Sequence, residues 1–142
     1  MRVQALGHVV VKVRSAQRSE IFYSGLLGMP IISRISDPVR MTFFSLAGGN
    51  HHDFAVLEVG DDAPVPDSRA VGLAHVAFKV GDSLEDYCAA EAALGSRQIT
   101  VLYTAERTHT KSLHLCDPDG HEVELYVDLP ATWRTSKAAV SA

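Results

Sequence analysis

The chain has 142 residues, of which 46% are hydrophobic and 21% charged, and its formal net charge is -4. This length suits one globular domain with a buried core. The acidic balance provides no basic surface for nucleic acid, and no apolar run reaches the ~20 residues that a membrane-spanning helix needs. The two cysteines, Cys88 and Cys116, form no CxxC pair. We therefore expect a cytoplasmic protein with reduced thiols that binds neither nucleic acid nor membrane.

The sequence repeats itself at a constant offset. Residues 8–13 (HVVVKV) match residues 75–80 (HVAFKV) at four of six positions, and the same offset aligns Ser45-Leu46 with Ser112-Leu113. A recurring offset of this kind indicates duplicated structural units. We predict two modules, about 1–60 and 72–128, within a single domain of residues 1–130. The polar, proline-containing segment 60–71 is the expected linker, and residues 131–142 form a C-terminal tail.

Both modules have the same expected order of elements, namely a strand, a helix and three further strands. Alternating apolar residues indicate the strands, and serine or aspartate before an apolar stripe indicates the start of a helix. Glycines at the expected helix ends, Gly28 and Gly95, suit C-caps. The expected strands are 5–13, 30–36, 39–46 and 52–59, then 73–80, 98–104, 110–116 and 121–127; the helices begin at Ser15 or Ser19 and at Asp82 or Ser83. We predict an α+β fold of two tandem βαβββ modules related by pseudo-twofold symmetry, whose curved mixed sheet encloses a metal site.

Histidines and acids recur at matching positions of the two modules. His8 and His75 occupy the same place in the first strand of each, and Glu124 lies on the last strand of the second. Its repeat mate is Glu58, if the turn of the first module carries one extra residue. A single strand histidine is usually a partly buried residue with one hydrogen bond, but the recurrence favours metal binding. Two histidines with one or two carboxylates suit a borderline divalent metal, and a two-His-one-carboxylate set suits ferrous iron.

Further histidines extend the candidate site. If alternation holds over 52–59, His52 shares a face with Glu58 and is placed to act as a general acid or base. The alternative is that His51 and His52 only close the preceding turn. His114 is expected to line the same cavity, and Arg107 and His109 lie in a loop of the kind that contacts substrates.

Four segments carry a resemblance to a known family: Gly7-His8-Val9, residues 22–29 (FYSGLLGM), residues 75–78 (HVAF) and residues 117–125 (DPDGHEVEL). They resemble the vicinal oxygen chelate superfamily, which includes glyoxalase I, methylmalonyl-CoA epimerase, fosfomycin- and bleomycin-resistance proteins and extradiol dioxygenases. The resemblance covers about residues 5–128. It implies a metal-dependent enzyme with a small-molecule substrate, and we expect a homodimer.

Two local matches imply different chemistries. Residues 52–55 (HDFA) resemble the His-Asp-x-Ala segment of extradiol dioxygenases, whose histidine assists proton transfer, whereas residues 55–58 (AVLE) resemble the glyoxalase I strand that supplies a glutamate ligand. We expect an extradiol-type dioxygenase that uses Fe(II) and O2 to cleave a catechol-like vicinal diol. The alternatives are a glyoxalase- or epimerase-type lyase or isomerase that uses Mn, Ni, Zn or Co, and a metal-free protein that sequesters a ligand.

Overall fold

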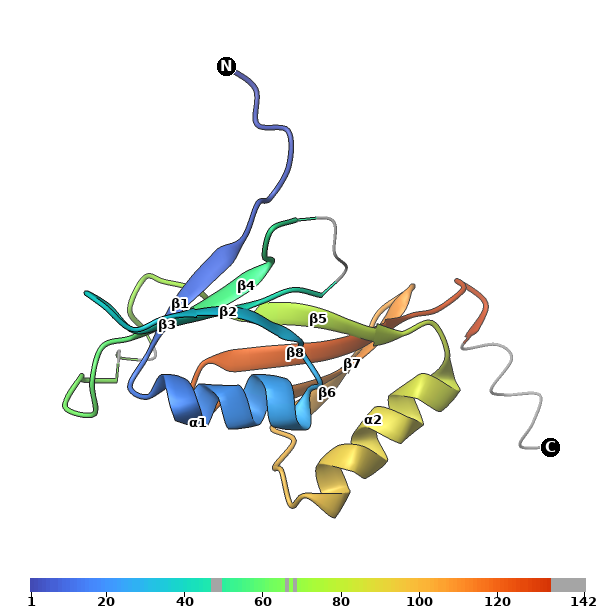
Figure 1. The fold of residues 1–142 in the computed structure, drawn as a ribbon. Coiled ribbons are helices and arrows are strands. Elements are labelled where there is room, and N and C mark those ends of the chain that lie inside the picture. The colour runs from blue at the N-terminus through green and yellow to red at the C-terminus, as the bar shows by residue number, and fades with distance from the viewer. Residues whose placement is uncertain (47–49, 66, 68, 134–142) are drawn as a thin grey trace. The chain divides into compact units, whose positions relative to one another are not determined.

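The structure is a computed structural model that describes residues 1–46, 50–65, 67 and 69–133 (Figure 1). The chain divides into two compact units, Met1–Ser68 and Arg69–Ala142. Their boundary falls inside the predicted linker 60–71. Residues 134–142 of the predicted tail lie outside the described residues.

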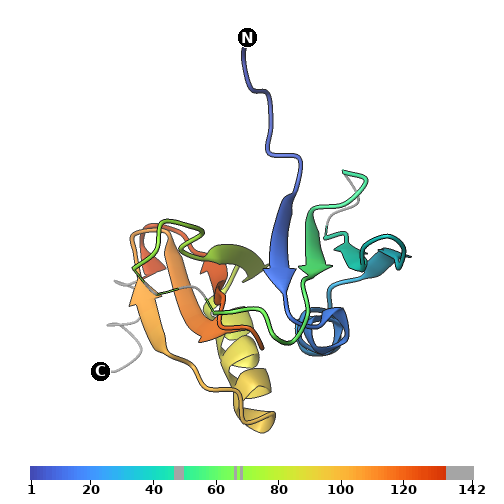
Figure 2. The same cartoon turned by 90° about the vertical axis from the view of Figure 1, so that its left-hand side faces the viewer.

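The N-terminal unit contains one helical segment and one mixed sheet. The order is β1 (Val9–Val13), α1 (Ala16–Glu20), the π-helical turn η1 (Ile21–Leu26), β2 (Ile31–Ile35), β3 (Met41–Phe44) and β4 (Phe54–Glu58). Within the sheet the strand order is β1-β4-β3-β2, with β1 parallel to β4 and the other pairs antiparallel. Figure 2 shows β1 and β4 side by side and running in the same direction.

The C-terminal unit repeats this arrangement. It contains β5 (Val76–Gly81), α2 (Leu84–Ser96), β6 (Tyr103–Glu106), β7 (Thr110–Cys116) and β8 (Glu122–Asp128). The strand order is β5-β8-β7-β6, with β5 parallel to β8. The identical topology of the two sheets confirms the predicted α+β class and its tandem βαβββ modules. The single domain of residues 1–130 and the homodimer stay predictions.

The ends of the helices follow the sequence signals in three of four cases. Ser15 and Ser83 act as N-caps, because their side chains accept hydrogen bonds from Arg18 N and Asp86 N. Gly28 ends η1 with a φ of 74°, which suits a residue without a Cβ atom. The prediction that Gly95 ends the second helix is wrong. This helix runs to Ser96, and Gln98 adopts the left-handed φ of 58° instead.

The strand boundaries differ most after α2. The strand expected over 98–104 begins only at Tyr103, because the turn through Gln98 and the segment after it delay sheet pairing. Its first ladder contact is Tyr103 opposite His114. This register determines which side chains stand beside the candidate site.

Each sheet packs one face on its own helix. In the N-terminal unit Tyr23 lies between Phe54 and Phe44, with ring centroids 4.7 and 5.9 Å away, and all three side chains are buried. In the C-terminal unit Tyr87 of α2 contacts Lys111, which shares a face with the buried Leu113. We call the opposite face of each sheet its distal face. No helix among the described residues has the length and apolar character needed to cross a membrane.

Candidate metal centre

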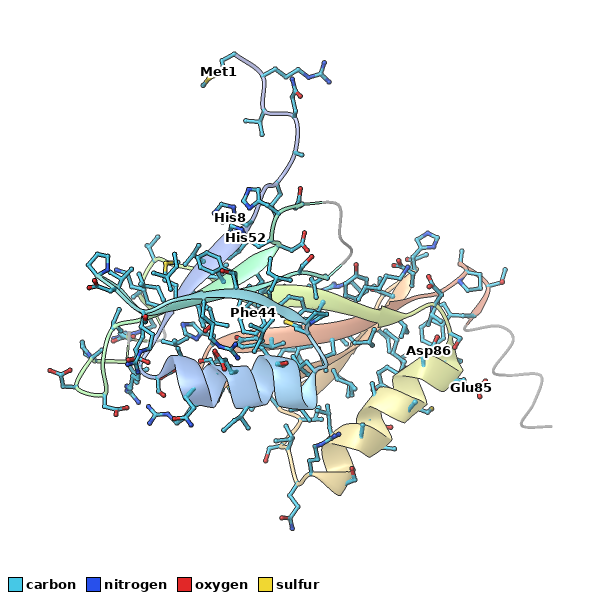
Figure 3. All side chains as sticks on the ribbon, viewed as in Figure 1. Met1, His8, Phe44, His52, Glu85 and Asp86 are labelled. Carbon is cyan, nitrogen blue, oxygen red and sulfur yellow. The ribbon has the colours of Figure 1, made fainter. Side chains whose placement is uncertain are left out.

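His8 lies directly before β1, and alternation along this strand places it with Val10 and Lys12 on the distal face. The alternate residues of the strand, Val11 and Val13, point toward α1 and are buried. The ring of His8 lies 4.2 Å from the ring of His52, centroid to centroid (Figure 3). The N-terminal unit therefore presents two imidazoles at the start of β1.

Backbone and side-chain hydrogen bonds fasten the loop that carries His52. Asn50 donates through Nδ2 to Gly7 O (3.2 Å) and to Asp53 Oδ1 (3.0 Å). The other carboxylate oxygen of Asp53 accepts from Leu46 N at 2.7 Å. The Asp53 carbonyl accepts from the backbone N–H of the first residue of β1 at 3.1 Å. These bonds hold the loop against the residue that precedes His8.

His52 is half-buried and lies beside Phe43, whose ring centroid is 4.9 Å away. Its Nε2 atom is buried and has no hydrogen-bond partner within the described part of the chain. Burial lowers the pKa of His52, and the neighbouring His8 and His51 lower it further. A lowered pKa favours the neutral imidazole, and the unpartnered Nε2 atom suits this ring to accept or pass on a proton.

His75 and Glu124 meet in the C-terminal unit. His75 directly precedes β5, at the position that His8 has before β1, and its Nε2 atom lies 3.2 Å from Glu124 Oε2. Glu124 is on β8 opposite Ala77 and alternates with the buried Val123 and Leu125, so it points to the distal face. The predicted pairing of a histidine and a carboxylate is present within this unit.

A second layer of polar residues supports Glu124. His114 on β7 is paired with Glu124 in the sheet and is 5% exposed. Its Nε2 atom lies 3.7 Å from Glu124 Oε1, and its Nδ1 lies 2.8 Å from Glu122 Oε1. Tyr103 stacks on His114 with ring centroids 4.2 Å apart and donates its hydroxyl hydrogen to Glu122. That bond lowers the pKa of Glu122 and raises the pKa of Tyr103.

Tyr103 and Glu122 are missing from the sequence-based site. Glu122 could have been predicted from the sequence, because it stands two residues before Glu124 and therefore lies on the same face of the strand. Tyr103 could not have been predicted, since only the register of β6 and β7 places it beside His114. His109 and Arg107 lie exposed around the hairpin between these strands, and their contact with substrate stays a prediction.

The predicted equivalence of Glu58 and Glu124 is wrong. In the C-terminal unit Glu124 of β8 pairs with Ala77 of β5. The residue that corresponds to Ala77 in the N-terminal repeat is Val10 of β1, and Val10 pairs with Ala55 of β4. Ala55 therefore holds the position of Glu124 in the N-terminal unit.

Glu58 points the other way, toward the helix. It stands opposite the buried Val13, accepts from Ala16 N of α1 at 2.9 Å and pairs with Arg40 at 3.2 Å. The prediction that His52 shares its face is also wrong, since β4 begins only at Phe54 and His52 packs on the distal side. Glu58 therefore acts as a cap for α1.

The donor pair of the C-terminal unit fits a divalent metal. Ligand atoms about 2.0–2.2 Å from one ion lie roughly 3 Å from each other. The 3.2 Å between His75 Nε2 and Glu124 Oε2 matches that separation. Imidazole and carboxylate are ligands of borderline metals. The N-terminal unit offers His8 at the equivalent position of its own distal face.

Comparison with known families agrees with this fold. The family model of the Glyoxalase/Bleomycin resistance protein/Dioxygenase superfamily matches residues 5–125. The chain belongs to this superfamily.

Individual relatives within it have different activities. A catechol-2,3-dioxygenase from Bacillus subtilis (strain 168) is 28% identical over 93% of this chain, but the match covers 45% of that dioxygenase. This chain therefore spans less than half the length of that relative.

Solved structures share the fold. A glyoxylase/bleomycin resistance protein/dioxygenase domain from Frankia sp. EAN1pec has a TM-score of 0.74 and 22% identity, covering 89% of this chain and 99% of that domain. A mutant of the fosfomycin resistance protein FosX from Listeria monocytogenes, complexed with Mn(II) and 1S,2S-dihydroxypropylphosphonic acid, has a TM-score of 0.69 and 18% identity. The structural match covers 96% of this chain and 99% of the FosX chain.

Proposed function

We propose that the protein is an extradiol-type dioxygenase that cleaves a catechol-like vicinal diol with ferrous iron and O2. The observation that carries the proposal is the register of β1 and β4. It places Ala55 where a second carboxylate ligand would stand and turns Glu58 toward α1. The chain then offers two histidines and one carboxylate, the set that leaves open positions in non-haem iron oxygenases.

In this proposal His8, His75 and Glu124 hold the metal. When bound, ferrous iron supplies Lewis-acid and redox chemistry toward a vicinal diol and dioxygen. His114 is the proposed outer partner of Glu124: its Nε2 atom lies 3.7 Å from Glu124 Oε1, and its ring is fixed by contacts with Glu122 Oε1 and Ser112 Oγ. Such outer partners fix the orientation of a ligand and raise its affinity for the metal.

His52 is the proposed proton carrier. Its ring lies against His8, so it stands beside a proposed ligand without being needed as one. Its free Nε2 atom can accept a proton from a diol hydroxyl and return it to the product. The half-buried position beside Phe43 limits exchange of that proton with water. Arg107 and His109, around the β6–β7 hairpin, are the proposed substrate contacts.

A lyase or isomerase of the glyoxalase type is the runner-up. In that function Glu58 or Glu124 would act as the base. The contacts of Glu58 with Ala16 N and Arg40 give Glu58 a structural role instead, which removes one of the two candidates. The dioxygenase proposal is also supported by the 28% identity to the Bacillus subtilis catechol-2,3-dioxygenase. The length difference makes the substrate itself part of the proposal.

The test is anaerobic reconstitution with Fe(II), followed by an oxygen-electrode assay with a panel of catechols. Parallel samples loaded with Mn(II), Ni(II), Zn(II) or Co(II) receive hemithioacetals and fosfomycin. We expect O2 uptake with at least one catechol and a yellow ring-cleaved product that needs iron. Turnover of a hemithioacetal or of fosfomycin without O2 uptake would overturn the proposal, and would assign the runner-up or a fosfomycin-resistance activity.

A further inference from the structure

Three histidines of the N-terminal unit, near the start of β1, form a cluster of which the proposed ligand set uses only His8. His8, His51 and His52 offer one nitrogen each, and these three nitrogens all lie within 4.8 Å of one another. All three belong to the N-terminal unit. The proposed enzyme gives His51 no role.

The rings face one another closely. The ring centroid of His51 lies 4.3 Å from that of His52 and 5.8 Å from that of His8. The Nδ1 atoms of His51 and His52 are 2.6 Å apart and share one hydrogen. A cation that replaced this hydrogen would be held by two imidazoles at once.

The loop is anchored on both sides but leaves the rings room to adjust. Asn50 and Asp53 tie it to the residue before His8, as described above. His8 and His51 are exposed, and His52 is half-buried. Three nitrogens around a tetrahedral zinc at ~2.0–2.1 Å lie roughly 3.3 Å apart. Side-chain rotation of the exposed rings covers the difference from the observed spacing.

We propose that His8, His51 and His52 form a second metal site, built within the N-terminal unit, for Zn(II), which binds nitrogen ligands more tightly than Fe(II) does. Three neutral imidazoles with one open position are a known zinc environment. Oxygen-preferring cations such as Mg(II) are not expected to bind, because the site contains no carboxylate ligand.

This site competes with the proposed catalytic centre for His8. Zinc bound through the His8 nitrogen that the iron needs would withdraw this ligand from the iron. It also occupies His52. The site itself depends only on residues of the N-terminal unit, and its test is independent of whether the protein is a dioxygenase.

The experiment uses the tag-free 142-residue chain carrying His75→Ala and Glu124→Gln, which removes the proposed metal ligands of the C-terminal unit. Zn(II) binding is measured by isothermal titration calorimetry, and Co(II) is added separately to record its visible absorption, which is strong only in a tetrahedral site. We expect one Zn(II) per chain and a tetrahedral Co(II) spectrum. Adding His51→Ala should weaken Zn(II) binding by more than about 10-fold, the lower limit of what losing even an outer-sphere partner costs.

A matched control carries His109→Ala on the same background, because it also deletes one exposed histidine but belongs to the C-terminal unit. It should bind Zn(II) as tightly as its parent. Absence of Zn(II) binding in the parent, or equal binding after His51→Ala, would overturn the site. Equal loss in the His109→Ala control would also overturn it, by showing that binding follows the number of histidines.

Discussion

The Nε2 atom of His75 lies 3.2 Å from Oε2 of Glu124, the spacing of two atoms that can share one metal ion. Because β5 and β8 are parallel neighbours, their register fixes this pair before any metal binds. His8 directly precedes β1 in the N-terminal unit, as His75 precedes β5 in the C-terminal unit.

His8→Ala and His75→Ala should each reduce bound iron from about one ion per chain to near zero after anaerobic desalting. Both side chains are exposed and precede strands, so their loss should leave the fold intact. Elemental analysis gives the iron content, and far-UV circular dichroism checks the fold. His109→Ala is the control and should keep its iron. Full iron content in either ligand variant would contradict the assignment.

His52→Ala should retain iron but slow turnover. The ring contacts His8 without being a proposed ligand, and loss of a positioned acid–base group costs about 10²–10⁴-fold. Steady-state kcat with the best catechol, together with iron content, measures this effect. Loss of iron would make His52 a ligand, and unchanged kcat would return it to the turn-closing role.

His114→Gln should weaken iron binding without removing a ligand. The His114 ring lies between Glu122 and Glu124, and loss of such an outer partner lowers metal affinity by roughly 10–100-fold. Tyr103→Phe is the matched control, since it keeps the stacked ring and deletes only the hydroxyl bonded to Glu122. Equal iron dissociation constants in the His114 variant and the wild type would show that His114 does not contribute to metal affinity.

The turn before β8 should make stability depend on pH. Asp117 is buried and its carboxylate accepts from His121 Nδ1 at 2.9 Å, which raises the pKa of His121. The nearby Asp119 raises it further. A raised folded pKa stabilises the protein below the unfolded value of about 6.5, and this contribution is lost as pH rises through the folded pKa.

His121→Gln should therefore reduce the free energy of unfolding by about 1 kcal/mol at pH 5.5 and by less at pH 8.5. Urea unfolding of both proteins at the two pH values measures this difference. His109→Gln serves as the exposed control. A deficit that grows toward high pH would contradict the expected direction of the pH dependence.

Repetition in the sequence predicted much of the fold. Residues 8–13 and 75–80 located β1 and β5, and both modules have the predicted order of elements. The helix end near Gly95 was missed because a glycine can also continue a helix, and a non-glycine residue, Gln98, took the left-handed position. Local signals of this kind place an element but do not fix its last residue.

The candidate site was predicted less completely because it depends on strand register. Glu58 and Ala55 lie three residues apart, so they fall on opposite faces of β4. A one-residue error in the preceding turn reverses the face assigned to each of them. The number of residues in a turn does not determine the register in which the flanking strands pair. For the same reason the stacking of Tyr103 on His114 could not be foreseen from the sequence.

In the proposed site the metal has a single carboxylate ligand, Glu124, and Glu58 binds Ala16 N and Arg40 instead of the metal. Iron content after anaerobic loading of Glu58→Gln and Glu124→Gln tests this arrangement directly, because both changes replace a carboxylate by an amide of the same shape. A glutamine at position 58 can still accept from Ala16 N, so the helix cap is kept. We predict about one iron per chain in Glu58→Gln and almost none in Glu124→Gln. Loss of iron from Glu58→Gln, or its retention in Glu124→Gln, would contradict the account.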